Sequence, residues 1–305
     1  MFLSSSTPVV YIDRATGRRV TETVMGDRAL RFAYETLLGR TLWTVLFGSR
    51  LVSALMGWRY DSPRSRKAIP ALATLPGCHP EEAERPADEY PSFNAFFTRR
   101  LKPGARPVGD GVVSPADGRL RLYLNADADT PFPLKGATRA LRAVFDGDAP
   151  VGRYDIAVIR LAPVDYHRFH FPCACETPEP ARVVPGAYHS VNPIALLRRP
   201  DVYAENERQI VKCRAAFGDV WLVDVGAFGV GTIVQTYTGA HHEKGDEKGY
   251  FKFGGSTVIL IAAAGKIAFD ADLVANSAAG LETRVLCGER IGSPQTALRR
   301  GEEML

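Results

Sequence analysis

The chain has 305 residues, of which 46% are hydrophobic and 24% are charged, and its formal net charge is +4 at pH 7. This composition is typical of a soluble globular protein, and the length suffices for one large domain or two modest ones. The positive excess is too small to indicate a nucleic-acid-binding protein.

The cysteines and the first residues bear on the compartment. The five cysteines are an odd number and are scattered along the chain. The opening stretch MFLSSSTPVVYIDR lacks the basic region and long apolar core of a secretory signal. Both features favour a reducing compartment.

Residues 27–60 are the first segment with a helical pattern. Asp27 can cap a helix whose apolar residues recur at helical spacing, namely Leu30, Ala33, Tyr34, Leu37 and Leu38. The longest uncharged runs, 41–49 and 51–58, are far shorter than the ~20 residues of a membrane-spanning helix. Aromatic residues and arginines alternate here, as in helices that lie in a membrane interface. A buried helical hairpin with arginines at its ends is an equally good interpretation of these residues alone.

Residues 61–89 are rich in Pro, Glu, Arg and Ala, and they predict a linker with a short helix. Ser92 can then cap a helical turn that carries Phe93, Phe96 and Phe97 on one face, which Pro103-Gly104 brings to an end. An aromatic face of this kind is more often part of a core than a binding surface.

From residue 112 onward the pattern is that of β-strands. Short apolar or alternating runs are separated by Gly, Pro and Asp: VVSPADGRLRLYL, DIAVIRLAPVDYHRFHFP, VWLVDVGAFGVGTIVQTYTG, FKFGGSTVILIAAAGKIAF and RVLCGERIG. They predict a sandwich or barrel of mostly antiparallel strands. The expected fold class is therefore α+β, with an N-terminal helical region and linker over 1–89 and a β-rich catalytic domain over 90–305.

Two stretches hold polar residues that could carry chemistry. In SPADG, Asp117 lies between a proline turn and a glycine, which is also typical of an aspartate that bonds its own backbone. In PVDYHRFHFPCACE, His167 and His170 would point to opposite faces of a strand. One hypothesis makes His167, His170, Cys173 and Cys175 the ligands of a zinc-binding hydrolase or structural zinc protein, although C-x-C is tighter than the usual ligand spacing.

A third stretch, FKFGGSTVILI at 251–261, is a strand interrupted by Gly254, Gly255, Ser256 and Thr257. Two adjacent glycines in a strand predict a bulge, a bend or the close approach of another group. Since Gly255 has no side chain to block the approach, the Ser256 hydroxyl could attack the preceding carbonyl once a base takes its proton. The known arrangement for removing a serine proton is a histidine oriented by an aspartate, and the two stretches above could supply that pair. The alternative is a plain glycine bulge in a barrel strand.

Taken in order, these stretches resemble the phosphatidylserine decarboxylases, which are pyruvoyl-dependent membrane enzymes. The resemblance is carried by FNAFFTRRLKPGARPV, VVSPADG, LAPVDYHRFHFP, YHSVNP followed by ENER, VDVGAFGVGTI and KGDEKGYFKFGGSTVIL. Gly254 stands where the family often has Leu, as in the branch with Gly-Gly-Ser-Thr. His189 and the Cys173/Cys175 pair are not part of the pattern, so no role is predicted for them.

The resemblance implies a chain that cuts itself. Ser256 would attack the carbonyl of Gly255, with His170 as the base and Asp117 holding its imidazole. The resulting ester would eliminate and hydrolyse, which leaves a pyruvoyl group at position 256 and two chains that stay associated. The covalent cofactor is thus made from Ser256, and no metal is expected.

The resemblance also implies the reaction and its setting. The pyruvoyl group would form a Schiff base with the amine of phosphatidylserine, and loss of CO2 would yield phosphatidylethanolamine. His167 is the best candidate to protonate the resulting carbanion. The expected location is the cytoplasmic side of the cell membrane, where residues 27–60 would bind peripherally, and the expected assembly is a homodimer.

Overall fold

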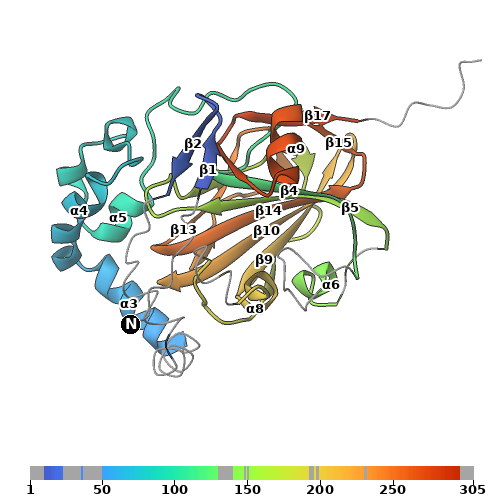
Figure 1. The fold of residues 1–305 in the computed structure, drawn as a ribbon. Coiled ribbons are helices and arrows are strands. Elements are labelled where there is room, and N and C mark those ends of the chain that lie inside the picture. Colours follow the sequence, from blue (N-terminus) through green and yellow to red (C-terminus); the bar gives the residue numbers. More distant parts are fainter. Residues whose placement is uncertain are drawn as a thin grey trace, which may run out of the picture.

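The computed structural model describes residues 10–22, 36, 50–129, 140–147, 149, 151–191, 196, 199–229 and 232–295. Within them, a large sheet forms the centre of the molecule (Figure 1). Ten of its strands follow the order β12-β7-β9-β10-β14-β5-β4-β16-β1-β2, and β8 also pairs with β9. The bounds are β1 (Val10–Asp13), β2 (Arg18–Thr21), β4 (Gly118–Asp127), β5 (Arg153–Leu161), β7 (Cys175–Glu176), β8 (Arg182–Val184), β9 (Arg208–Ala215), β10 (Gly218–Gly229), β12 (His241–His242), β14 (Gly254–Ala263) and β16 (Glu282–Val285).

Two smaller sheets complete the β structure of the described residues. They are β11 (Ile233–Gln235), β13 (Glu247–Phe251) and β6 (Arg168–His170), and β15 (Ile267–Phe269), β17 (Arg290–Pro294) and β3 (Val112–Val113). Every pairing between these strands is antiparallel except that of β1 with β16, which is parallel. The prediction of a mostly antiparallel β-rich fold is therefore confirmed.

Strand β14 lies between β10 and β5 and is buried on both faces. Alternate residues of its apolar run face opposite ways, because side chains alternate along a strand. Val258 and Leu260 belong to one hydrophobic core, and Ile259 and Ile261 belong to a second core on the other face. The second core is covered by α6 (Leu141–Val144) and α8 (Val202–Glu205), and the first is closed by the smaller sheets and α9 (Ala271–Ala278).

A third core belongs to the helical segment before the β-rich part. Its elements gather at one end of the central sheet (Figure 1). They are α3 (Arg50–Asp61), η1 (Pro63–Ala68), α4 (Ile69–Ala73), η2 (Pro80–Glu82), η3 (Ala87–Glu89) and α5 (Phe93–Phe97). Ser92 caps α5, since its Oγ accepts a hydrogen bond from the Ala95 N–H at 3.1 Å. Phe93, Phe96 and Phe97 are buried in this core, which confirms the core interpretation of that aromatic face.

The chain's first described residues form a hairpin that the sequence pattern did not predict. Strand β1 pairs with β2 and, in parallel, with β16, where Tyr11 lies opposite Glu282. Arg14 in the hairpin turn forms ion pairs with Asp270 at 3.0 Å and Asp272 at 2.7 Å beside α9. The helix predicted from Asp27 lies outside the described residues, and no described helix is long and apolar enough to cross a membrane. The division of the chain at residue 89 stays a prediction.

A buried ion pair fastens β13 to the central sheet. The Lys248 ammonium donates to Oδ2 of Asp224 on β10, and to Oε1 of Gln235 at 3.2 Å. Gln235 in turn donates to Asp224 Oδ2 at 2.8 Å. The ammonium also lies 4.9 Å from the centre of the Phe169 ring. Both charged side chains are almost completely excluded from water, so each depends on the other for its solvation.

Removing one member of this pair should be far more damaging than removing both. In an uncut Ser256→Ala background, we expect Lys248→Met to lower the free energy of unfolding by about 3–5 kcal/mol, because Asp224 then stays buried without its counter-ion. The double variant Lys248→Met/Asp224→Leu should recover most of that loss. Urea unfolding measures all three, and a Lys248→Met loss below about 1 kcal/mol would show that the pair is not a buried charge of this kind.

Candidate active site

Ser256 lies in the middle of the central sheet. It pairs with Gly226 on β10 and with Leu161 on β5, and its side chain is fully buried. Its Oγ has no hydrogen-bond partner among the described residues. A buried hydroxyl without a partner is energetically costly, and such atoms are concentrated at functional sites.

The strand opposite Ser256 carries a bulge. Between its pairings with Ser256 and Gly254, β10 advances from Gly226 to Gly229, which is one residue more than β14 advances. Gly254 has a φ of +152°, a backbone conformation that side chains disfavour. The Gly255–Ser256 linkage therefore lies where the regular ladder is broken. The adjacent glycines predicted a bulge, a bend or a close approach in their own strand; the extra residue lies instead on the opposite strand, β10.

His167 is completely buried just before β6. Its Nδ1 donates to the Asp165 carbonyl oxygen at 2.9 Å, so its Nε2 carries a lone pair. That Nε2 has no partner among the described residues. Burial lowers the pKa of His167 to about 3, which keeps the ring neutral and Nε2 unprotonated at neutral pH. The ring lies 3.9 Å from that of Phe97, and the His167 carbonyl accepts from the Phe251 N–H, close to the start of β14.

His170 lies at the end of β6 in a more open setting. Its Nδ1 donates to the Gly245 carbonyl at 2.9 Å, and its Nε2 accepts from the Tyr166 hydroxyl at 3.1 Å. Burial lowers the pKa of His170, and the nearby carboxylates of Glu247 and Asp117 oppose that shift. It lines a cavity of about 500 Å³ with Arg100, Leu101, Lys102, Gly104, Arg106, Tyr166, Thr236 and Glu247. The two histidines thus occupy separate environments, as their spacing predicted.

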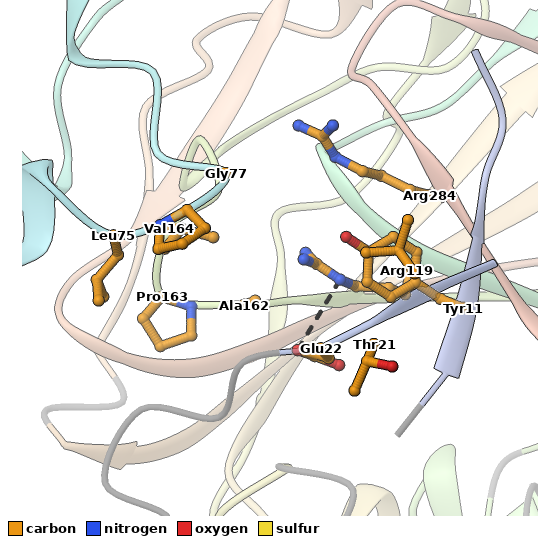
Figure 2. A pocket seen from close by; sticks show the side chains of 12 residues that line it. Tyr11, Thr21, Glu22, Leu75, Gly77, Arg119, Ala162, Pro163, Val164 and Arg284 are labelled. Atoms are coloured by element: carbon orange, nitrogen blue, oxygen red, sulfur yellow. Dashed lines mark ion pairs between the residues drawn. The ribbon is translucent and has the colours of Figure 1, made fainter. Parts of the chain in front are cut away.

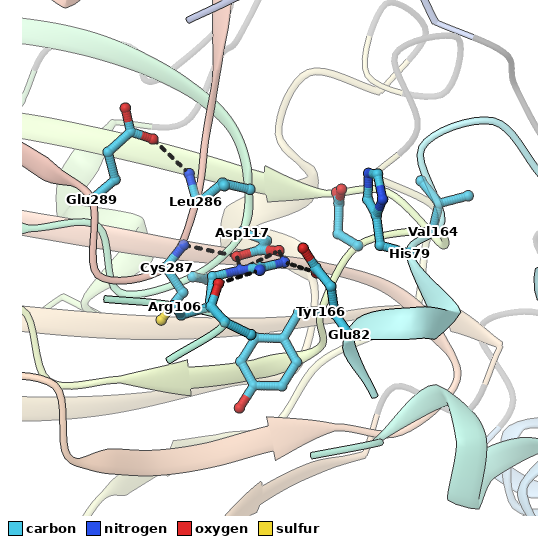
Figure 3. Close-up of polar contacts among 12 residues, drawn as sticks. His79, Glu82, Arg106, Asp117, Val164, Tyr166, Leu286, Cys287 and Glu289 are labelled. Atoms are coloured by element: carbon cyan, nitrogen blue, oxygen red, sulfur yellow. Dashed lines mark hydrogen bonds and ion pairs between the residues drawn. The ribbon is translucent and has the colours of Figure 1, made fainter. Parts of the chain in front are cut away.

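Asp117 does not hold the imidazole of His170, contrary to the expectation from the resemblance. Its carboxylate accepts hydrogen bonds from Arg106, from Nε at 2.9 and 3.2 Å and from Nη2 at 2.7 Å, and another from the Cys287 N–H at 2.7 Å (Figure 3). Arg106 also pairs with Glu82 at 2.9 Å. A guanidinium presents two parallel donors that match a carboxylate, so it outcompetes a single imidazole N–H. Asp117 acts on His170 through its charge.

A chain of buried ion pairs supports the loop that leads to His167. Asp165 accepts from the Arg119 guanidinium and, at 2.6 Å, from the Ala162 N–H. Arg119 and Arg160 both lie against Glu22, where Arg160 Nη2 and Glu22 Oε2 are 2.6 Å apart. Figure 2 shows Glu22 and Arg119 at one cavity of about 200 Å³, together with Tyr11 and Arg284. The segment that follows the N-terminal hairpin thereby reaches the loop that carries His167.

The sequence reasoning missed several of these groups although they lie inside the quoted motifs. Asp165 and Tyr166 are in LAPVDYHRFHFP, and Arg106 is in KPGARPV. A tyrosine directly before the first histidine was a usable signal for a group that contacts an imidazole, whereas Asp165 contacts His167 only through its backbone carbonyl. Arg106 gave no such signal, because its partner is decided only by the folded chain.

The zinc hypothesis finds no support in the site. Within the described part of the chain, no three His, Cys, Asp or Glu side chains are arranged to hold a metal ion. His167 uses Nδ1 for a backbone carbonyl, and Cys173 and Cys175 belong to the first hydrophobic core together with Cys213. All five cysteines are buried free thiols.

Comparisons with known proteins agree with the motifs. The model of the family described as phosphatidylserine decarboxylase matches residues 93–293. A protein of Chlamydia felis named phosphatidylserine decarboxylase proenzyme is 40% identical over 290 residues, which cover 92% of this chain and 97% of that protein. A proenzyme of the same name from Desulfitobacterium hafniense is 38% identical over 295 residues, which cover 93% of this chain and 98% of its own.

The buried neutral histidines predict how stability depends on pH. The pKa of His167 is lowered to about 3 and that of His189 to about 4, in both cases by burial. Below pH ~6.5 the unfolded chain binds protons at these rings and the folded chain does not, so stability falls as the pH drops toward 4. We expect His167→Gln in the Ser256→Ala background to make this fall shallower by about one proton, as measured by urea unfolding between pH 4 and 7.

The matched control for that measurement is His241→Gln, since the His241 side chain is 81% exposed in the folded chain. The free energy of unfolding of this control should change with pH as steeply as that of the parent. A His167→Gln slope identical to the parent's would show that the ring is not held neutral by burial.

Proposed function

The chain belongs to the phosphatidylserine decarboxylase family, and we infer that it converts phosphatidylserine to phosphatidylethanolamine and CO2. The relatives that establish the family are named proenzymes, so an inactive precursor precedes the active form in them. One observation carries the proposal for this chain: the unpartnered hydroxyl of Ser256, buried in the central sheet directly after two glycines and opposite a bulge.

The proposed first reaction is self-cleavage at Gly255–Ser256. Ser256 Oγ bonds to the Gly255 carbonyl carbon while the peptide C–N bond breaks, and the hydroxyl proton passes through a base to the freed amine. Removal of the Ser256 α-proton then expels the Gly255 carboxylate and leaves dehydroalanine. Water converts this residue to a pyruvoyl group and releases ammonia. Atoms and charges balance with one water consumed, and no metal or oxidant is required.

The site offers two bases for these proton transfers. We propose His170 for the attack, because its Nε2 lone pair is held only by the Tyr166 hydroxyl. Asp117 favours the imidazolium that forms, through its charge rather than through a hydrogen bond. We propose His167 for a later step, because it is neutral and its Nε2 has no partner among the described residues. It would first take up a proton and then donate that proton to the carbon that lost CO2.

The residues around Ser256 fit a pyruvoyl group. Such a group supplies a ketone that condenses with a primary amine and accepts the electron pair released with CO2. Ser256 Oγ and His167 Nε2 are both buried and have no hydrogen-bond partner among the described residues, so a carbonyl at position 256 would lie in a water-poor setting with few competing partners. Lys102, Arg100 and Arg106 place positive charge around the His170 cavity, which suits an anionic lipid head group.

Self-cleavage is tested by chain length. Wild-type protein should give two chains on a denaturing gel, with the small one blocked to N-terminal sequencing, and Ser256→Ala should give one intact chain. His170→Ala should slow cleavage by at least about 10²-fold, because general-base catalysis contributes on this order. His241→Ala is the matched control and should cleave normally.

A chelator should leave both cleavage and decarboxylation unchanged. Intact mass before and after hydroxylamine, which traps an ester and modifies a ketone, identifies the chemical state of position 256. A wild-type chain that stays intact and still converts phosphatidylserine would refute the proposal.

We also propose that α3 brings the enzyme to the membrane surface. Leu55 and Trp58 are 66% and 75% exposed on this helix, and Arg59 lies beside them in its last turn. Exposed Leu and Trp beside Arg are suited to the interface of a bilayer with anionic lipid. The family's phospholipid substrate supports this location, which we assign to the cytoplasmic face of the cell membrane. We further propose that the two cleaved chains stay together and assemble as a homodimer.

The double variant Leu55→Ser/Trp58→Ser should bind vesicles of phosphatidylcholine and phosphatidylglycerol at least about tenfold more weakly, because two apolar side chains no longer enter the interface. Val151→Ser is the matched control, since Val151 is 98% exposed elsewhere on the molecule. Sedimentation with vesicles measures the binding. Equal binding by the double variant and the control would show that α3 is not the docking element.

A further inference from the structure

The helical N-terminal part contacts the chain immediately before the proposed cleavage site. The side-chain oxygen of Asn94 on α5 accepts a hydrogen bond from the Phe253 N–H at 2.9 Å. Asn94 Nδ2 donates to Oδ1 of Asp61, the last residue of α3, at 3.0 Å. Asp61 Oδ2 pairs with the Lys252 ammonium at 2.8 Å. Two helices are therefore joined to two consecutive residues that precede Gly254.

The Phe253 side chain is held as firmly as its backbone. Its ring centre lies 4.6 Å from that of Tyr60, 4.8 Å from that of Phe93 and 5.1 Å from that of Phe97. Three aromatic contacts from α3 and α5 restrict the position of the ring. Each contributes stabilisation beyond that of the apolar area it buries. Phe97 also contacts the ring of His167, so Phe253 and this histidine have one aromatic neighbour in common.

The scissile linkage is thereby held at both ends. On its carboxyl side, Ser256 is fixed by pairing with Gly226 and Leu161. On its amino side, Gly254 pairs with Gly229 on β10, and the Asn94 bond to Phe253 lies one residue further back. Gly255 lies between these attachments, and Gly254 has a φ of +152°. Because glycine backbones are intrinsically free, the position of the Gly255 carbonyl depends on how closely the attachments bracket it.

The orientation of the Asn94 amide is itself fixed by Asp61. A carboxylate can only accept, so the amide nitrogen must face Asp61 and the amide oxygen must face the Phe253 N–H. Asn94 is 3% exposed, so water does not compete for these bonds. The Asp61–Lys252 pair is more open, and an ion pair of that kind contributes little by itself.

We propose that Asn94 is a positioning residue for self-cleavage: through Phe253 it sets the Gly255 carbonyl within reach of the Ser256 hydroxyl, with Asp61 orienting the amide. This rests on the proposed cleavage at Gly255–Ser256. Asn94 touches neither reacting atom, so its effect is on the first step, in which the ester forms. Lys252, through its ion pair with Asp61, makes a minor contribution to the same positioning.

The experiment follows full-length chains made by cell-free synthesis, with the cut and uncut forms quantified on denaturing gels over time. Asn94→Ala should cleave about 10–100-fold more slowly than wild type, since a small displacement of reacting atoms costs this much. Hydroxylamine should not restore the rate, because the ester it would intercept is formed slowly. Lys252→Met should slow cleavage less than about threefold. Asn276→Ala is the matched control, a comparable loss on α9 of a side-chain bond to Thr283.

The exchange variant Asn94→Asp/Asp61→Asn tests the hydrogen bonds themselves. It restores one amide facing one carboxylate and keeps an acceptor for the Phe253 N–H, so cleavage should return to within about threefold of wild type. The single Asn94→Asp, with two facing carboxylates, should be slow, and it replaces Asn94→Ala if the alanine variant does not fold. Wild-type rates in the slow variants, or an exchange variant as slow as the singles, would overturn the role of Asn94. A wild-type chain that is never cut would instead overturn the proposed function.

Discussion

The placement of Ser256 within a doubly covered strand is the constraint on which the rest of the structure depends. A self-cutting chain has to bring a hydroxyl against its own backbone carbonyl without water reaching the resulting ester. Strand β14 meets this need because β10 and β5 flank it and apolar cores cover both faces. The local cost is an unpartnered hydroxyl and a broken ladder at the bulge. Neighbouring pairs such as Lys248 with Asp224 fasten the adjoining strands firmly enough to tolerate it.

Burial also assigns different tasks to chemically similar groups. His167 and His170 are three residues apart, yet one ring is sealed beside Phe97 and the other opens onto a polar cavity. Desolvation lowers the pKa of His167 and keeps its ring neutral, and nearby carboxylates oppose the same effect on the pKa of His170. Arginine pairs hold the carboxylates of Asp117 and Asp165 at fixed positions. The site is thus arranged mainly by which charges are shielded from water, and by how well each is paired.

Local signals predicted much of the fold. The alternating runs became strands and Ser92 capped its helix, because each pattern depends on residues close in sequence. The hairpin β1–β2 escaped notice because its strands are short and charged, and its parallel partner β16 comes near the far end of the chain. The partner of Asp117 was wrong for a related reason. Arg106 and His170 both had suitable chemistry, and only the folded geometry decides which lies closer.

The position of β14 in the sheet has a further consequence for an enzyme made of two pieces. Everything from Ser256 onward, including most of β14, all of α9 and strands β15 to β17, would belong to the smaller piece. That piece contributes a central strand with neighbours on both edges, together with β16 between β4 and β1. Withdrawing it would open the sheet in two places, so dissociation and denaturation are the same event. Copies cut at Gly255–Ser256 would therefore not exchange their smaller pieces in the native state, and each would keep the piece with which it was synthesised.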